Sequence, residues 1–224
     1  AEQEINSKRL LVLAQHLTNN DLKIDSLSIV RNGCMVLDAY FYPFSKGLRL
    51  PLRSCTKSIM SALIGIAIDK GYIKNVNQPI KDFFPDKTIA NMDDYKKSIT
   101  LEHLLMMASG LDCKDSYLYE WRGLFEMRRS TDWSQFVLDL PIAGPPGKIF
   151  EYCNGASFLL SAILQKTTGM TALEFAEKHL FGPLGISDIM WPINPRGINI
   201  GWGELRMRPH DMAKIGYLYL NEGL

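Results

Sequence analysis

The sequence predicts a fold that combines an α/β part with an all-α part. Two observations support this fold class. Asn32-Gly33 separates two runs of β-forming residues, 26–31 and 34–42, and an Asn-Gly pair in this setting is a strong signal for an antiparallel hairpin. After the hairpin, apolar residues recur at helical spacing through most of the 224-residue chain. Because a two-stranded hairpin is marginal by itself, we expect its antiparallel sheet to need further strands or a covering helix.

Helices are predicted on both sides of the hairpin. Before it, apolar residues at helical spacing predict an amphipathic helix over Ser7–Leu17. After it, a wide apolar stripe predicts a long helix over Ser54–Lys70, with Gly71 at its C-terminal end. Further helices are predicted from Thr100 onward and over residues 131–140, 156–168, 171–179 and 209–220.

The order of these elements predicts three segments. Residues 1–60 are expected to form the N-terminal part of an α/β domain, and residues 61–200 a mainly helical domain. Residues 201–224 are expected to return towards the α/β domain. No third or fourth long strand is evident in any of the three segments.

The composition is that of an ordinary soluble globular protein, with 46% hydrophobic and 22% charged residues. A formal net charge of +1 gives no reason to expect nucleic acid or an anionic membrane as a partner. The longest apolar stretch, around 63–68, is far shorter than the roughly 20 residues of a membrane span. Ala1 stands where a Met would begin the chain. A cleaved signal peptide would place the protein in the periplasm or outside the cell, whereas a trimmed chain leaves a cytoplasmic location open.

The four cysteines, Cys34, Cys55, Cys113 and Cys153, show no CxxC or metal-ligand spacing. In a chain of this length we interpret them as buried thiols rather than as a disulfide framework. The sequence implies neither a metal nor an organic cofactor.

Ser54 and Lys57 lie three positions apart at the start of the predicted long helix, so their side chains face the same way. A lysine can accept the proton of a serine hydroxyl when burial or a nearby cation lowers its pKa. Amides at a helix N-terminus can also stabilise an oxyanion. Ser-x-x-Lys is common by chance, however, and an N-cap serine with a solvated lysine explains this motif alone more simply.

Tyr152-Cys153-Asn154 follows the rigid turn at 145–147 and precedes a predicted buried helix. A tyrosine near Lys57 could act as a general base and then protonate a leaving group. The Asn154 amide both donates and accepts hydrogen bonds, as a group that holds a carbonyl must. By itself, a packed tyrosine followed by a turn asparagine is again the simpler explanation.

The two motifs together, in their order and flanking context, change this interpretation. The sequence resembles the serine β-lactamases, penicillin-binding DD-peptidases and related esterases. The resemblance is strongest to their class C-like branch, which includes family VIII esterases and oligoamide hydrolases. The matching segments span most of the chain, at residues 52–58, 71–73, 104–111, 146–155, 181–186 and 209–216.

The resemblance implies a β-lactamase/transpeptidase-like fold, with an antiparallel sheet and a helical domain. It implies a serine hydrolase that cleaves a small-molecule ester or amide, β-lactams included, through an acyl-enzyme on Ser54. Lys57 and Tyr152 would act as general base and acid, and Asn154 would bind substrate. Which of Lys57 and Tyr152 is the acylation base stays open, because such a pair titrates as a unit.

Members of this family carry a third motif, Lys-Thr-Gly or a substitute, on a late strand. The similar Lys166-Thr167-Thr168-Gly169 is interpreted as a helix end with a glycine cap, and Gly201-Trp202-Gly203 comes too early. We therefore expect the chain to be truncated at Leu224, before the last strands. A missing C-terminal segment or a second chain would then complete the sheet.

Two alternatives are kept. The absence of a third motif favours a non-catalytic binding or regulatory relative, and an exported DD-peptidase acting on cell-wall peptides is the other. For substrate contacts, the aromatic residues of one loop, Tyr117, Tyr119 and Trp121, are the predicted candidates.

Overall fold

A computed structural model describes residues 3–20 and 22–223, except for the side chain of Tyr117. Ala1 and the expected chain end at Leu224 lie outside these ranges. The chain divides into two compact units. The first comprises Ala1–Pro51, Ile186–Met190 and Arg206–Leu224, and the second comprises Leu52–Gly185 and Trp191–Leu205. Within the described ranges, none of the helices has both the length and the apolar character needed to cross a membrane.

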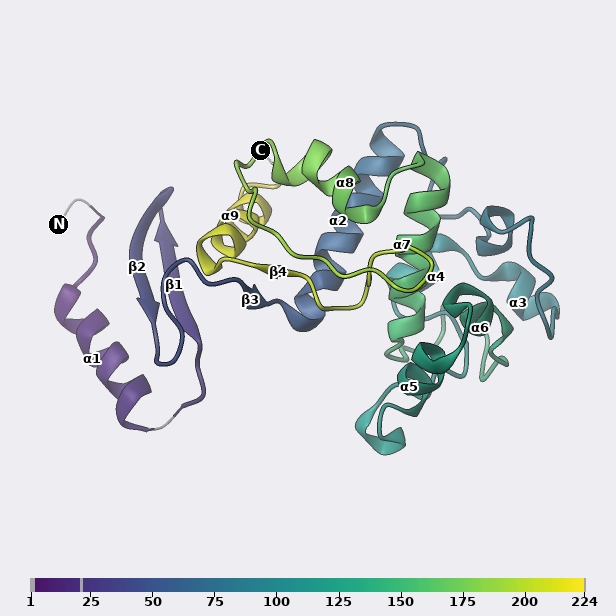
Figure 1. Cartoon of the computed structure of the whole chain (residues 1–224), viewed down its shortest axis with the longest axis horizontal. Coiled ribbons are helices and arrows are strands. Elements are labelled where there is room, and N and C mark those ends of the chain that lie inside the picture. Colours follow the sequence, from purple (N-terminus) through teal and green to yellow (C-terminus); the bar gives the residue numbers. More distant parts are fainter. Residues whose placement is uncertain (1–2, 21, 224) are drawn as a thin grey trace. The chain divides into compact units, whose positions relative to one another are not determined.

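The first unit contains the hairpin and two terminal helices (Figure 1). The predicted hairpin is confirmed, and φ angles of 48° at Asn32 and 74° at Gly33 give both turn residues the left-handed backbone that a type I′ turn needs. A register shift between Ile29 and Val30 bends the ladder. The elements of this unit are α1 (Ser7–Asn19), β1 (Ser26–Arg31), β2 (Cys34–Tyr40), β3 (Leu50–Pro51), β4 (Arg206–Met207) and α9 (Pro209–Leu220).

The hairpin has the covering helix that its sequence requires. Helix α9 packs against β1, and the Tyr217 hydroxyl lies so close that a Cβ on Gly33 would meet it at 3.2 Å. Strands β3 and β4 pair with each other in a separate two-stranded sheet, with Leu50 opposite Met207. In the described part of the chain these strands are only two residues long, too short to give a sequence signal.

The second unit is helical and is built around α7 (Asn154–Thr168). All residues of α7 from Asn154 to Leu164 are buried, and the helix packs against α2 (Thr56–Asp69), α4 (Leu101–Leu105) and α6 (Trp133–Asp139). Figure 1 shows α2 and α7 side by side. The other elements of the unit are η1 (Arg53–Cys55), η2 (Ile80–Phe83), α3 (Asp94–Ser98), η3 (Tyr117–Tyr119), α5 (Arg122–Arg129), α8 (Ala172–Ala176) and the π-helical turn η4 (Glu177–Phe181).

Most predicted helices are confirmed with shifted ends. Helix α9 has the predicted bounds, and α7 ends before Gly169, whose φ of 72° is that of a left-handed C-terminal cap. The 171–179 segment instead divides into α8 and η4. Helix α7 begins at Asn154, two residues earlier than predicted, because the Cys153 sulfur accepts the Ala156 N–H and caps the helix there.

The interpretation of the cysteines as buried thiols is wrong. Cys113 and Cys153 form a disulfide, while Cys34 and Cys55 are exposed free thiols. The two bonded residues are 40 positions apart. Only the packing of the loop before α5 against the start of α7 brings them together, and spacing along the chain does not reveal such a contact.

The loop at 201–203 packs tightly on α7. A Cβ on Gly201 would lie 2.3 Å from the Ser157 carbonyl oxygen, so Gly201→Ala is expected to lower the free energy of unfolding by about 1–3 kcal/mol. Gly65 in α2 is the matched control, because nothing lies within 4 Å of its added Cβ. Gly65→Ala should stabilise the helix by about 0.5–1 kcal/mol. Urea unfolding of both variants checks these opposite signs, and equal effects would contradict this account of the packing.

Candidate active site

Ser54 lies in the short turn η1, immediately before α2, rather than in the α-helix that was predicted to start with it. Arg53 has a φ of 50°, a left-handed conformation that costs energy for a residue with a side chain. The turn is held in place because Leu52 N–H donates to Leu205 O at 2.8 Å and Thr56 Oγ1 donates to Arg53 O at 2.7 Å. This strained turn presents the exposed Ser54 side chain.

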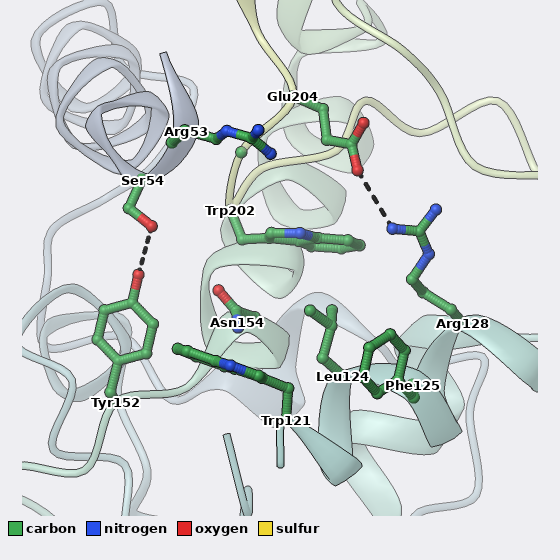
Figure 2. Close-up of a pocket in the computed structure, with 11 residues that line it drawn as sticks. Arg53, Ser54, Trp121, Leu124, Phe125, Arg128, Tyr152, Asn154, Trp202 and Glu204 are labelled. Carbon is green, nitrogen blue, oxygen red and sulfur yellow. Dashed lines mark hydrogen bonds and ion pairs between the residues drawn. The ribbon is translucent and has the colours of Figure 1, made fainter. Parts of the chain in front are cut away.

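The structure brings the Tyr152-Cys153-Asn154 segment to Ser54. The Tyr152 hydroxyl donates to Ser54 Oγ at 2.7 Å, as Figure 2 shows. Asn154, the first residue of α7, is buried with 4% of its surface exposed. The two motifs are about one hundred residues apart in the sequence, and α7 packing against α2 joins them.

Lys57 lies between the two motifs. Its Nζ is 3.4 Å from Ser54 Oγ, 2.9 Å from Asn154 Oδ1 and 2.7 Å from the carbonyl oxygen of Trp202. The ammonium group also lies 4.7 Å from the centre of the Tyr152 ring. Burial lowers the pKa of Lys57 from its ordinary value of 10.5 to about 8, and the nearby carboxylate of Asp115 opposes this shift. About one-tenth of Lys57 is therefore neutral at pH 7, and the neutral fraction increases as the pH rises through 8.

A cavity of about 360 Å³ opens beside Ser54. Figure 2 shows the Trp121 and Trp202 rings on either side of Asn154, with Leu124 on the side away from the Ser54–Tyr152 pair. An ion pair between Arg128 and Glu204, with 3.2 Å between nitrogen and oxygen, lies at the cavity as well. The lining residues are Arg53, Ser54, Trp121, Leu124, Phe125, Arg128, Tyr152, Asn154, Trp202, Gly203 and Glu204.

Of the three aromatic residues predicted to contact substrate, Trp121 lines this cavity and its ring lies 6.3 Å from that of Tyr152. Tyr119 does not line it, and the side chain of Tyr117 lies outside the described residues. In the part of the chain that the structure describes, no group of three His, Cys, Asp or Glu side chains is placed to hold a metal ion.

Two contacts of the site are not predicted by the sequence. The Gly201-Trp202-Gly203 segment comes too early for the family's third motif, yet the Trp202 carbonyl oxygen accepts a hydrogen bond from Lys57 Nζ. Gly201 was the available signal, because a chain that approaches a helix this closely leaves no room for a Cβ. Asp115 gave no sequence signal, and its contact with Asn154 appears only in the folded chain.

Comparisons with known proteins place these residues in a familiar fold. Residues 13–220 match the family model described as Beta-lactamase. The chain is 22% identical over 233 residues to the 6-aminohexanoate-dimer hydrolase of Paenarthrobacter ureafaciens. This match covers 96% of this chain and 58% of that protein. The chain thus spans little more than half the length of that curated relative.

Two solved structures show the same fold at low sequence identity. FmtA from Staphylococcus aureus matches with a TM-score of 0.75 and 18% identity, over 99% of this chain and 69% of that one. The octameric penicillin-binding protein homologue from Pyrococcus abyssi matches with a TM-score of 0.72 and 17% identity, over 98% of this chain and 57% of that one. Identities this low indicate a shared fold and say nothing about a shared substrate.

Proposed function

The chain belongs to the beta-lactamase family, and from this premise we propose that it is a serine hydrolase acting through an acyl-enzyme on Ser54. The observation that carries the proposal is the position of Ser54 Oγ, 2.7 Å from the Tyr152 hydroxyl and 3.4 Å from Lys57 Nζ. A serine hydroxyl becomes an effective nucleophile when an adjacent group removes its proton. The substrate class is an ester or an amide, and the similarity to a 6-aminohexanoate-dimer hydrolase supports amides.

The contacts of Lys57 favour it as the base for acylation. A neutral lysine has two N–H bonds and one lone pair. Asn154 Oδ1 and the Trp202 carbonyl oxygen can only accept hydrogen bonds, so they take the two N–H bonds. The lone pair is then left for the third neighbour, the Ser54 hydroxyl at 3.4 Å.

The proposed step transfers the Ser54 proton to Lys57 as Ser54 Oγ bonds to the substrate carbonyl carbon. The Tyr152 hydroxyl, 2.7 Å from Ser54 Oγ, then supplies a proton to the leaving oxygen or nitrogen, and Lys57 restores it. The Ser54 amide, in the turn η1 that precedes α2, contributes one donor to the oxyanion. Water releases the acyl group by the reverse sequence of proton transfers.

The proposal is tested by covalent labelling. The chain is treated with a fluorophosphonate, which reacts with activated serines, and its intact mass is measured before and after. We expect a single adduct on the unchanged chain and none on Ser54→Ala. Ser58→Ala, which removes an exposed serine four residues later on α2, is the matched control and should still be labelled. No adduct on the unchanged chain would favour the non-catalytic binding alternative.

Trp121 is expected to contribute to substrate binding. Trp121→Ala removes one wall of the cavity, so it should raise KM for aryl or long-chain esters by about 10-fold, as loss of a partly buried aromatic contact does. Tyr119→Ala removes a half-exposed aromatic ring from the same loop but outside the cavity, and KM should stay unchanged. Steady-state kinetics on a series of p-nitrophenyl esters measures both. Equal changes in the two variants would argue against Trp121 as a substrate contact.

A further inference from the structure

Asp115 lies in the loop before α5, is buried with 3% of its surface exposed, and contacts the first residue of α7. Its Oδ2 accepts the backbone N–H of Asn154 at 2.8 Å. Burial raises the pKa of Asp115, whereas the amides of Asn154, Leu124 and Gly155 and the charge of Lys57 lower it. Removing a carboxylate from water has a free-energy cost, and these contacts must offset that cost for Asp115 to stay buried.

Asn154 connects Asp115 to Lys57. Its backbone N–H donates to Asp115, and its side-chain Oδ1 accepts from Lys57 Nζ at 2.9 Å. One residue therefore holds the lysine and is itself held by the carboxylate. Asp115 is also the charged group whose field acts on Lys57, among the residues that the structure describes.

The loop that carries Asp115 is clamped to the Tyr152–Asn154 segment. The disulfide joins Cys113 to Cys153, two residues before Asp115 and one before Asn154. On the other side of the disulfide, the amides of Cys113 and Lys114 act on the part-buried carboxylate of Glu151. A carboxylate from each segment thus faces amides of the other, with the disulfide between the two contacts.

The other charged groups on the loop of Asp115 interact with each other and with Glu151. Lys114 pairs with Asp112 at 3.0 Å, and burial together with the charge of Asp112 raises the pKa of Glu151. These groups lie on the Glu151 side of the disulfide and are not among those that act on Lys57. Asp115 therefore has no neighbour in the described residues that duplicates its negative charge at the lysine.

We propose that Asp115 is a positioning residue for acylation, which fixes Asn154 against Lys57 and supplies the buried negative charge that faces the lysine. The proposal rests on the proposed function, in which neutral Lys57 accepts the Ser54 proton. It implies a defined pH range in which Ser54 can be acylated. The Asp115 charge favours protonated Lys57, so it moves the onset of activity to higher pH while making Lys57 a stronger base above that onset.

The test is Asp115→Asn, which removes the charge and keeps the shape. The rate constant of fluorophosphonate labelling is measured against pH. Its acidic limb should shift to lower pH by roughly 0.5–1 unit, as expected for loss of a nearby charge in a partly buried site. The rate above the limb should fall about 10-fold because Lys57 becomes a weaker base and the neutral amide accepts the Asn154 N–H less strongly than the carboxylate does. A residue with only a structural role would lower the rate without shifting the limb.

Asp112→Asn is the matched control, since it removes the same charge from the same loop three residues earlier. The acidic limb of its labelling rate against pH should stay where it is in the unchanged chain. An unshifted limb in Asp115→Asn, or an equal shift in both variants, would overturn the proposal.

Direct titration of Lys57 separates this proposal from the proposed function. In protein labelled with carbon-13 at lysine Cε, the Lys57 signal is assigned by its loss in Lys57→Met. Its apparent pKa should fall in Asp115→Asn, and in the unchanged chain the signal should show a second, small step at acid pH, where Asp115 takes up a proton. If Lys57 shows both effects but Ser54 is never labelled, the coupling stands and the hydrolase proposal fails. If neither effect is seen, the coupling is wrong whatever Ser54 does.

Discussion

Lys57→Met is expected to slow acylation of Ser54 by about 10³-fold, the loss typical of removing a general base. Methionine has a similar length and fills the part-buried space, so the loss would reflect chemistry rather than a cavity. The rate constant of fluorophosphonate labelling is the measurement. A melting curve at the same pH shows that the variant is folded.

The pH dependence identifies the base. Burial lowers the pKa of Lys57 to about 8, so the neutral form increases as pH rises through that value. The labelling rate of the unchanged chain should therefore rise with pH to a plateau above an apparent pKa near 8. In Lys57→Met this limb should disappear.

Tyr152→Phe distinguishes the two candidate bases. It removes the hydroxyl that lies 2.7 Å from Ser54 Oγ and keeps the ring beside Lys57. The rate should fall by about 10²-fold while the limb near pH 8 remains. If the limb is instead lost in Tyr152→Phe and kept in Lys57→Met, Tyr152 is the base and Lys57 does not accept the Ser54 proton.

Local sequence patterns predicted the secondary structure because the responsible interactions are local. The Asn32-Gly33 turn needs a left-handed backbone at both of its residues. Helix α7 ends at Gly169 because this glycine adopts the same left-handed conformation. Helix α9 has its predicted bounds because Pro209 suits a first turn and the periodicity continues to Leu220. In each case the neighbours that determine the structure are within a few residues.

The candidate site was predictable only in part, because its contacts join distant segments. Spacing alone suggested that Ser54 and Lys57 face the same way. That Tyr152 and Asn154 reach them was expected from a family resemblance, and the distances come from the packing of α7 on α2. The Trp202 carbonyl and Asp115 could not be found this way, because a backbone oxygen has no sequence signature and a buried aspartate resembles a loop aspartate.

The disulfide is the contact whose removal should most affect stability. A bond between residues 40 positions apart restricts the unfolded chain, and by the usual chain-entropy relation it contributes about 4 kcal/mol to the free energy of unfolding. Replacing both Cys113 and Cys153 with serine is the appropriate variant. Serine at 153 can still cap α7, where the Cys153 sulfur now accepts the Ala156 N–H at 3.2 Å, so the cap is kept and only the bond is lost.

Urea unfolding of this double variant should show the loss of about 4 kcal/mol, and reduction of the unchanged chain should reproduce it. The control replaces the two exposed free thiols, Cys34 and Cys55, with serine, and should change the free energy of unfolding by less than about 0.5 kcal/mol. A chain that unfolds at the same urea concentration with and without reductant would show that the bond does not form. Because the bond lies next to the hydrogen bond between Asn154 and Asp115, its loss should also slow Ser54 labelling in chains that remain folded. Slower labelling at unchanged stability would mean that the disulfide acts on the site alone, whereas a loss of stability with normal labelling would leave Asp115 to hold Asn154 without it.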